Sequence, residues 1–309
     1  MKLVFYDDFK LGAMKGDNVV DLTDAVSGIA HTSPQDLLNK LIENFSQHRS
    51  GLQQAVDQGT EVPVSQVRLR SPLPSPNIIC MAVNYMEDGT RDEPAPINAF
   101  IKLPSTVIGP GDTMVLPDVP AAIFEGEAEM ALVISKKASN VSAADAFDYI
   151  FGYFNFIDGS ARGLPPAGNT FYQMKSRDTF APMGPCLVTA DEIADPQKLQ
   201  IRLWVNEELK QNFNTDDMAQ QIPRIIEWVS SIHELNPGDV IATGTNHRGL
   251  SAFMDGDKVE LSVDGLDTLR FNVKDDLKRI WPRTTRLEMT EQGKEGTAVQ
   301  TSGKYAPGA

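Results

Sequence analysis

The segment Phe124-Glu-Gly-Glu-Ala-Glu-Met-Ala-Leu-Val-Ile134 joins three evenly spaced glutamates to an apolar run. The apolar run predicts a strand that enters a hydrophobic core. Glu125, Glu127 and Glu129 occupy alternate positions, and alternate side chains of a strand point to the same face. The sequence therefore predicts three carboxylates side by side on one face of this strand.

Three carboxylates at this spacing repel one another, and burial strengthens the repulsion. A divalent cation would compensate for their charge, because carboxylate oxygens are the preferred ligands of Mg²⁺ and Mn²⁺. The alternative is a strand face in water, which needs no cation, and this segment alone leaves both interpretations open. The 309 residues include two Cys and four His, so a metal site is expected to use carboxylates.

Short strands bounded by Gly, Pro or Asp are predicted around this segment. They cover residues 77–83, 112–116, 128–135, 199–205, 239–242, 258–263 and 268–273. One amphipathic helix is predicted at 216–235, with Pro223 near its start as a kink or a shifted beginning. Many strands and few helices favour a β-rich α+β fold over an alternating βαβ fold.

The chain is expected to have three parts. Residues 1–76 form a small α/β domain that ends in the proline-rich linker 71–76, and residues 77–282 form the β-rich domain. In the first part, a helix is predicted to begin after the N-cap Ser33. Its strands are predicted at 1–6, 19–22 and 66–70. Residues 283–309 are polar, so they are expected to be mobile or to dock on a partner subunit.

The composition excludes several classes of function. Asp and Glu number 42 against 28 Lys and Arg, and the net charge of −14 disfavours binding to nucleic acid or to an anionic membrane. No stretch approaches the roughly 18 apolar residues of a membrane span, and the first residues lack the pattern of a signal peptide. A cytoplasmic protein with a small-molecule partner is the expectation.

Three further segments carry side chains suited to a site. An aromatic strand ends in Asp158, where a carboxylate could add a metal ligand or cap a turn. Lys175 could orient a substrate carboxylate, neutralise the acidic cluster or lie on the surface. Gly244 stands between two threonines, where it would let backbone N–H groups approach an anionic ligand.

In this order, the segments resemble the fumarylacetoacetate hydrolase family over about residues 77–280. The matching pieces are Val83-Asn-Tyr85, Phe100-Ile-Lys-Leu-Pro-Ser105, Gly109-Pro-Gly-Asp112, Glu127-Ala-Glu129, Asp158-Gly-Ser-Ala-Arg162, Lys175-Ser-Arg-Asp-Thr-Phe180 and Thr243-Gly-Thr245. The resemblance implies a β-roll or barrel that is usually a homodimer and that many bacterial members extend with a small N-terminal domain.

The resemblance also implies roles for individual residues. Glu127, Glu129 and Asp158 match the family's ligands for Mg²⁺, Mn²⁺ or Ca²⁺. Lys175 matches a lysine beside the metal, and Glu125 falls where the family often has an acidic residue that supports the ligands. The matching substrate-binding positions are Arg162, Thr245, Tyr85 and Gly244.

One position departs from the family pattern. Members activate water with a His that follows the Asn-Tyr sequence and with a Glu one helical turn later, whereas this chain has Asp88 and Arg91 there. The candidate bases are therefore Glu87, Asp88 and, from another loop, His247. The polar segment 89–96 could form a lid over the substrate.

Three functions remain open. The first is a metal-dependent hydrolase of aromatic compound catabolism that cleaves a C–C bond in an acylpyruvate or β-diketo acid through a metal-stabilised enolate. The second is a decarboxylase, isomerase or hydratase of a 2-oxo or 2-hydroxymuconate-type acid. The third is a non-catalytic member that binds a metal and a small acid.

Overall fold

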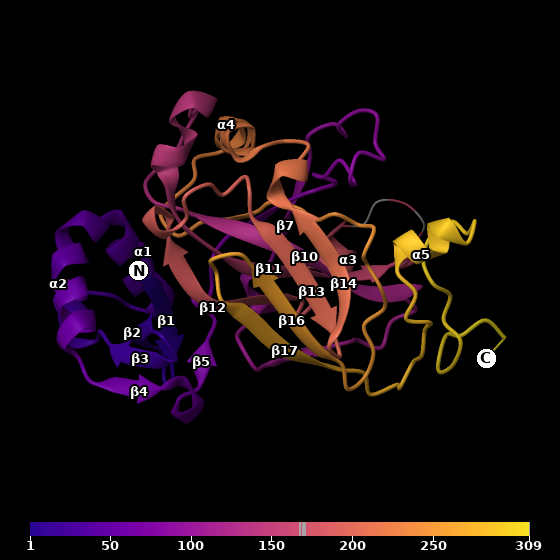
Figure 1. Ribbon diagram of the computed structural model, residues 1–309, viewed down its shortest axis with the longest axis horizontal. Coiled ribbons are helices and arrows are strands. Elements are labelled where there is room, and N and C mark those ends of the chain that lie inside the picture. The colour runs from indigo at the N-terminus through magenta and orange to yellow at the C-terminus, as the bar shows by residue number, and fades with distance from the viewer. Residues whose placement is uncertain (167, 169–170, 309) are drawn as a thin grey trace.

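Strands β10 (Ile123–Ile134) and β11 (Ile150–Arg162) form a long antiparallel pair at the centre of the molecule (Figure 1). The computed structural model describes residues 1–166, 168 and 171–308. Every residue of β10 is buried, including its three glutamates. The strand predicted at 128–135 is thus the second half of a longer strand that already contains the glutamates.

Among the described residues, twelve strands form the larger sheet. Its main path runs β4-β3-β2-β1-β12-β11-β10-β15-β6-β7, with β5 paired to β1 and β8 paired to β12. Besides the central pair, these strands are β1 (Lys2–Tyr6), β2 (Lys10–Lys15), β3 (Asn18–Asp21), β4 (Glu61–Pro63), β5 (Leu69–Arg70), β6 (Ile78–Met81), β7 (Ala99–Lys102), β8 (Val107–Ile108), β12 (Ala181–Thr189) and β15 (Val240–Ala242). Because β15 is the second neighbour of β10, the loop that follows β15 lies beside the glutamates.

A second sheet packs against the central pair. Its order is β14-β13-β16-β17-β9, from β9 (Thr113–Val115), β13 (Gln200–Val205), β14 (Glu208–Asn214), β16 (Lys258–Val263) and β17 (Thr268–Lys274). Gly126 stands between two of the glutamates, and a Cβ atom there would lie 2.3 Å from the ring of Phe253. The small residue between the acidic positions therefore allows the opposite face of β10 to pack closely against the core.

The N-terminal strands extend the larger sheet, because β1 pairs with β12. The helices α1 (Pro34–Glu43) and α2 (Phe45–Gln58) lie on this part of the chain, at the left of Figure 1. Ser33 caps α1 as predicted, and its hydroxyl accepts a hydrogen bond from the backbone N–H of Asp36 at 3.1 Å. That residues 1–76 form a separate domain stays a prediction.

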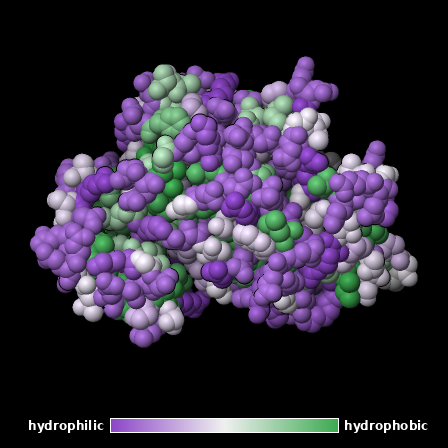
Figure 2. All heavy atoms as spheres, viewed as in Figure 1, coloured by the Kyte–Doolittle hydropathy of each residue, from purple (hydrophilic) through white to green (hydrophobic). Residues whose placement is uncertain are grey.

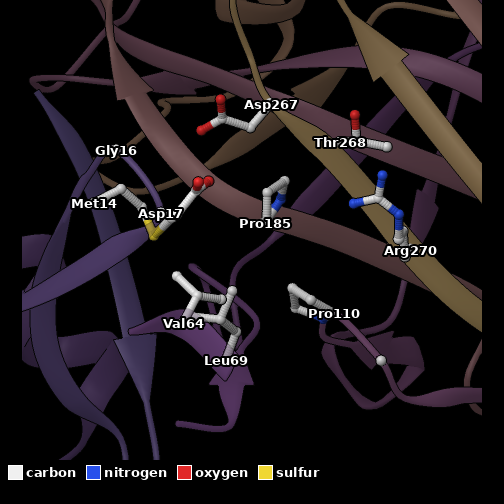
Figure 3. A pocket seen from close by; sticks show the side chains of 11 residues that line it. Met14, Gly16, Asp17, Val64, Leu69, Pro110, Pro185, Asp267, Thr268 and Arg270 are labelled. Atoms are coloured by element: carbon white, nitrogen blue, oxygen red, sulfur yellow. The ribbon is translucent and has the colours of Figure 1, made fainter. Parts of the chain in front are cut away.

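A cavity of about 410 Å³ lies between these N-terminal strands and the second sheet (Figure 3). Its lining includes Met14, Val64 and Pro110, together with Asp17, Asp267 and Arg270. Within the described part of the chain, no predicted site residue lines this cavity. This cavity is therefore separate from the predicted site residues.

The helix predicted at 216–235 is shorter in the structure, where α4 covers Ile222–Ile232. Pro223 occupies the first turn, in which its missing N–H needs no partner, so it starts the helix rather than kinking it. Residues Thr215–Asp217 form a separate 3₁₀ turn that the side chain of Asn214 caps. The short helix α3 (Phe171–Lys175) lies against β11 and β7.

The last part of the chain folds back onto its own body. Helix α5 (Arg286–Glu291) starts with a capping box between Thr285 and Glu288, and Lys304 pairs with Asp118 at 2.7 Å. Figure 1 shows α5 at the opposite end of the molecule from α1 and α2. Residue 309 lies outside the described residues, and docking of the segment 283–309 on a partner subunit stays a prediction.

The fold is the strand-rich α+β arrangement that the sequence predicts. The face in Figure 2 is largely hydrophilic with scattered apolar side chains, in keeping with the excess of acidic residues. Among the described residues, no helix has the length and apolar character needed to span a membrane.

Candidate metal and active site

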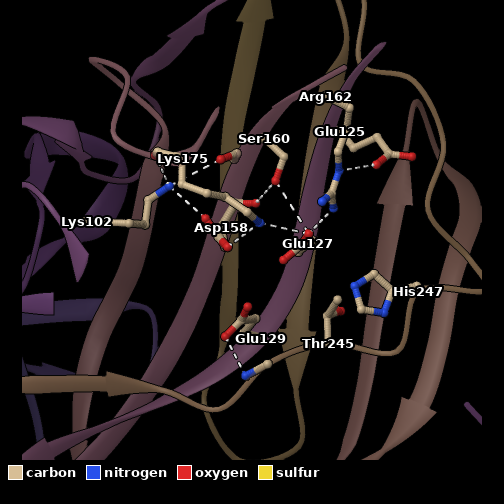
Figure 4. Close-up of polar contacts among 12 residues, drawn as sticks. Lys102, Glu125, Glu127, Glu129, Asp158, Ser160, Arg162, Lys175, Thr245 and His247 are labelled. Carbon is tan, nitrogen blue, oxygen red and sulfur yellow. Dashed lines mark hydrogen bonds and ion pairs between the residues drawn. The ribbon is translucent and has the colours of Figure 1, made fainter. Parts of the chain in front are cut away.

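Three buried carboxylates meet at the centre of the β10–β11 pair (Figure 4). Glu127 and Glu129 lie on one face of β10, as their spacing predicts, and the strand register places Asp158 of β11 opposite Glu127. One carboxylate oxygen from each of the three residues lies within 4.8 Å of the other two. This spacing allows all three to bind a single cation.

Two buried lysines hold the Asp158 end of this cluster. The Nζ atom of Lys102 donates to Oδ1 of Asp158 at 2.7 Å, and Nζ of Lys175 lies 2.6 Å from Oδ2. Lys175 also pairs with Glu127 at 2.9 Å. Burial alone would lower the pKa of Lys175, but the carboxylates of Asp158 and Glu127 raise it above its ordinary value. The lysine is therefore a fixed positive charge within the cluster.

The two glutamates differ in their electrostatic surroundings. Burial would raise the pKa of Glu127, but Lys175 and Arg162 hold it well below its ordinary value. Glu129 accepts a hydrogen bond from the backbone N–H of Gly244 at 2.7 Å, but no lysine or arginine pairs with it within the described chain. Burial, followed by the charges of Asp158 and Glu127, raises its pKa well above the ordinary value.

Glu129 provides the test of whether a metal ion fits this site. Among the described residues, its Oε1 atom is buried and has no hydrogen-bond partner. A buried carboxylate oxygen without a partner is costly, and a divalent cation would supply the missing interaction. The donor set is entirely oxygen, which suits Mg²⁺, Mn²⁺ or Ca²⁺. The residues present therefore fit a hard divalent ion.

Two arginines contact Glu125, which lies two residues before Glu127 on β10. Arg162 donates from Nε to Glu125 at 3.0 Å and also pairs with Glu127. From the C-terminal helix, Arg286 donates from Nη2 to the same carboxylate at 2.5 Å and from Nε at 3.2 Å. Glu125 therefore connects the carboxylate cluster to the last part of the chain.

A histidine and a glutamate form a hydrogen-bonded pair beside this cluster. The Nδ1 atom of His247 lies 2.6 Å from Oε1 of Glu87, and the backbone N–H of His247 donates to Oε2 at 2.8 Å. His247 also lies near Glu127, close enough that a protonated imidazole would lower the pKa of that carboxyl group. Two of the three candidate bases thus come together, although 160 positions separate them in the sequence.

Asp88, the third candidate base, is placed differently. Its side chain is half exposed and pairs with Arg248 at 3.1 Å. Its backbone N–H donates to Asp217 at 3.0 Å. Asp88 is not among the described residues that line the cavity beside Glu87 and His247, and the three clustered carboxylates are not among them either. The residue at the position of the family histidine therefore contacts Arg248 at the edge of the cavity, and the neighbouring Glu87 lines the cavity itself.

A cavity of about 480 Å³ opens above the paired residues. Four arginines are among its lining residues, which come from two loops, the end of β11 and helix α5: Val83, Glu87, Thr90, Arg91, Arg162, His247, Arg248, Arg286, Leu287 and Thr290. The sequence-predicted residues Arg162, Glu87 and His247 are thus brought to one space. Thr90 and Arg91 belong to the proposed lid segment.

The remaining predicted substrate residues lie deeper. The hydroxyl of Thr245 donates to the carbonyl of Ala128 at 2.7 Å and accepts from Gln211 at 2.9 Å. Tyr85 is fully buried and packs edge-on against Phe213, with ring centroids 5.0 Å apart. In the structure these two side chains hold the loops around the site, and neither lines the cavity.

Sequence reasoning missed three residues of this site. Lys102 ends strand β7 within the matching segment Phe100–Ser105, and that segment was the available signal. Gln211 lies inside β14, a strand that the sequence pattern did not predict. Arg286 belongs to a segment whose polar composition predicted a mobile tail, and its sequence offered no sign that it reaches the central strand.

Comparison with known proteins shows to which family the chain belongs. The model of the fumarylacetoacetate (FAA) hydrolase C-terminal domain matches residues 77–274. The chain belongs to the fumarylacetoacetate hydrolase family. The maleylpyruvate hydrolase of Aquipseudomonas alcaligenes is 30% identical over 291 residues, which are 89% of this chain and 99% of that protein. Oxaloacetate tautomerase YisK of Bacillus subtilis is 37% identical over 219 residues, 67% of this chain and 73% of that protein.

Solved structures of this family extend the comparison. The maleylpyruvate hydrolase of Sphingobium sp. SYK-6, in complex with a manganese(II) ion and pyruvate, has a TM-score of 0.80 and 34% identity, and the match covers 89% of this chain and 99% of that one. The fumarylacetoacetate hydrolase of Exiguobacterium antarcticum has a TM-score of 0.77 and 28% identity, with 89% and 99% covered. Family members with names of hydrolases, isomerases and tautomerases thus share this fold.

Proposed function

We propose that the chain is a divalent-metal-dependent hydrolase that cleaves the C–C bond of an acylpyruvate, a 2,4-dioxo acid. The observation that carries the proposal is the hydrogen-bonded pair of His247 and Glu87 beside three buried carboxylates. The similarity to maleylpyruvate hydrolases over 89% of the chain supports it. The base that the family pattern places at position 88, and that this chain lacks there, would come instead from these two loops.

Glu127, Glu129 and Asp158 are the residues that would hold Mg²⁺ or Mn²⁺. When bound, the ion would act as a Lewis acid for the 2-oxo acid end of the substrate and stabilise negative charge there. Lys175 keeps Glu127 and Asp158 in place and adds a positive charge where an enolate develops. Arg162, which reaches the cavity, would hold a substrate oxygen.

His247 would be the general base. Its Nδ1–H is donated to Glu87, so Nε2 is left as the proton acceptor. Nε2 would take a proton from water as the water oxygen bonds to the acyl carbon of the substrate. The C–C bond then breaks, its electron pair passes to the pyruvate enolate, and the enolate takes up a proton at carbon. The products are one carboxylic acid and one pyruvate.

The proposal is tested by mixing the protein and Mn²⁺ with maleylpyruvate or 2,4-dioxopentanoate. We expect loss of the ultraviolet absorbance of the enol and the release of one pyruvate per substrate, measured enzymatically. His247→Gln and Glu87→Gln are expected to lower the rate strongly, and Asp88→Asn is the matched control with little change. Pyruvate release that survives His247→Gln but not Asp88→Asn would contradict the assignment of the base.

A second candidate function is enol–keto tautomerisation or isomerisation of a 2-oxo acid, and decarboxylation belongs to the same alternative. The similarity to oxaloacetate tautomerases favours it, and a proton-transferring pair without water activation is sufficient for it. The same assay separates the two. Exchange of the substrate's C3 protons with solvent D₂O without release of pyruvate would favour the second function.

A homodimer is also part of the proposal, from the resemblance to the family. Light scattering of the purified protein tests it, with a mass of about twice the 33.9 kDa of one chain as the expected result.

A further inference from the structure

We propose that Gln211 of β14 is a positioning residue that holds the base loop, residues 243–250, against the metal-binding strand β10. The inference rests on the proposed function in one respect: it takes His247 of this loop as the group that moves a proton. Gln211 is 1% exposed and is not among the described residues that line the cavity beside His247. It therefore acts through the groups that it holds and not on the substrate.

On one side, Gln211 holds the strand that carries two of the proposed metal ligands. Its Oε1 atom accepts a hydrogen bond from the backbone N–H of Ala128 at 3.0 Å, and Ala128 stands between the two glutamate ligands. The pairing of β10 with β15 covers residues 131–133, so Ala128 lies beyond it. The amide of Gln211 thus satisfies a buried backbone N–H as a neighbouring strand would.

On the other side, the same amide holds the peptide bond that precedes His247. The Nε2 atom of Gln211 donates to the carbonyl of Asn246 at 2.7 Å. The N–H of that peptide bond, which belongs to His247, donates to Oε2 of Glu87 at 2.8 Å. Because a peptide bond is planar, hydrogen bonds at both of its ends fix its plane, and with it the direction in which the imidazole leaves the backbone.

The orientation of the Gln211 amide is itself fixed. Its second N–H is donated to Oγ1 of Thr245 at 2.9 Å, and Thr245 donates in turn to the carbonyl of Ala128 at 2.7 Å. A flipped amide would place its N–H groups against the N–H of Ala128. Figure 4 shows Thr245 and His247 on the same loop, beside β10. Gln211 therefore binds the strand and the loop at the same time and in one orientation only.

A β-bulge directs Gln211 into the interior. Lys210 is an extra residue in the register of β14 against β13, and the adjacent side chains of Lys210 and Gln211 are both buried. A regular strand would turn one of the two outward. The base loop packs directly on this bulge, since a Cβ atom at Gly249 would lie 2.1 Å from the carbonyl oxygen of Lys210.

Loss of the amide should displace the base more than the metal ligands. The ligands lie on the long β10–β11 pair, whose backbone hydrogen bonds do not involve Gln211. The carbonyl of Asn246 would lose its buried partner, and the peptide before His247 would then be held by Glu87 alone. A displacement of about 1 Å can lower a catalysed rate by on the order of 10²-fold. The expected loss is therefore in kcat.

Two variants separate the two sides of Gln211. Gln211→Met keeps the length of the side chain and removes all of its hydrogen bonds, whereas Gln211→Glu keeps an acceptor for Ala128 and removes both donors to the base loop. The matched control is Gln197→Met. It removes an amide that donates to the carbonyl of Thr215 at 3.1 Å and accepts from the N–H of Ile222 at 2.6 Å.

Three quantities are measured on each full-length protein. The first is kcat and KM for pyruvate release from 2,4-dioxopentanoate with Mn²⁺, and the second is the affinity for Mn²⁺ by calorimetry. The third is the nuclear magnetic resonance spectrum of the ring nitrogens in protein labelled with ¹⁵N-histidine, with Mg²⁺ in place of paramagnetic Mn²⁺. The signals of His247 are those missing from His247→Gln, and they show which ring nitrogen carries the proton.

We expect both Gln211 variants to lower kcat by about 10–100-fold, with KM and Mn²⁺ affinity changed by less than about threefold. In the wild type, His247 should be a single tautomer with its proton on Nδ1, because this atom lies 2.6 Å from Glu87. Both Gln211 variants should show a mixture of tautomers. Gln197→Met should match the wild type in all three measurements.

An unchanged kcat in both Gln211 variants would overturn the proposal. So would a parallel loss of kcat and Mn²⁺ affinity with a wild-type His247 spectrum, because that pattern shows a purely structural role at β10. A tautomer mixture in the Gln211 variants of a protein that releases no pyruvate from any acylpyruvate would support the positioning role and contradict the proposed hydrolysis. The two failures are therefore distinguishable.

Discussion

The candidate site has two ends that are built in different ways. At one end, Glu127, Glu129 and Asp158 lie on two long paired strands and are almost completely buried. At the other end, His247 and Arg286 come from a loop and a short helix, and their side chains are 19% and 26% exposed. The strand end offers fixed ligand geometry. The loop end offers side chains that a substrate can reach and that can differ between family members.

Under the proposed function, this difference accounts for a base that does not come from position 88, where the family has a histidine. The strand-borne ligands depend on the register of β10 and β11, which cannot change at one position without moving its neighbours. The base needs only to reach the same space, and here Glu87 and His247 reach it from two separate loops. We infer that the metal end is the more constrained half of the site.

The largest effect is expected at the strand end. Asp158→Asn should lower turnover by on the order of 10³-fold or more, because a proposed metal ligand is lost. It should also lower the free energy of unfolding by about 3–5 kcal/mol, because Lys102 and Lys175 are left buried without their shared partner. Enzyme assays and urea denaturation measure the two effects. The double variant Asp158→Asn/Lys102→Met should regain stability but no activity. Unchanged stability in Asp158→Asn would contradict the view that buried ion pairs hold the strand end of the site.

The second prediction separates activity from stability at the loop end. His247→Gln should lower kcat/KM by about 10²–10⁴-fold, the usual contribution of a general base. The free energy of unfolding should change by only about 1 kcal/mol, because one partly exposed hydrogen bond to Glu87 is lost. Parallel rate and denaturation measurements on the same preparation test this. A loss of stability as large as that of Asp158→Asn would show that the two ends are not built differently.

The third prediction concerns pH and Glu129. Without metal, its folded pKa is raised above 4.5, so its contribution to stability is present below pH 4.5 and is lost as the pH rises through the raised value. The melting temperature of EDTA-treated wild type should therefore fall relative to Glu129→Gln as the pH increases, by about 2–4 °C for each kcal/mol. Calorimetry at several pH values measures the difference. The lowered pKa of Glu127 acts in the opposite direction, but it acts below pH 4.5. A difference that is the same at pH 5 and pH 8 would refute this account.

The smallest effect is expected at the helix cap of the C-terminal segment. Thr285→Ala removes the capping box and should cost about 1 kcal/mol, confined to α5. Amide hydrogen exchange should show faster exchange in residues 286–291, and calorimetry should show weaker binding of a 2-oxo acid. The matched control is Ser33→Ala, which removes the cap of α1 at similar cost and should leave ligand binding unchanged. Equal effects of Thr285→Ala and Ser33→Ala on ligand binding would show that the C-terminal segment makes no contribution of its own to the site.

The strand end was largely predictable from the sequence. Alternation of three glutamates identified one face of β10. Asp158 was named as a metal ligand through the resemblance to the family. The prediction that the aromatic strand ends at Asp158 was wrong, because β11 continues to Arg162. The metal test needed coordinates, because only packing shows that Oε1 of Glu129 is buried without a partner.

The loop end was predictable only in part. Glu87 and His247 were named as candidates, but their contact joins positions 160 residues apart and depends on how β15 pairs with β10 and β6. Arg286 could not be inferred, since a polar segment has no periodicity that records what it covers. The helix predicted from residue 216 was too long because Thr215–Asp217 form a separate 3₁₀ turn capped by Asn214, and the helix itself begins at Ile222, beside Pro223.

The central claim is that the strand-borne carboxylates bind a divalent metal, and metal occupancy tests it most directly. Mn²⁺ binding is measured by calorimetry for the wild type, Glu127→Gln and Glu125→Gln, two variants on the same strand face. The account predicts one Mn²⁺ per chain for the wild type and for Glu125→Gln, and loss of binding in Glu127→Gln. Equal binding of Mn²⁺ by the wild type and Glu127→Gln would contradict it.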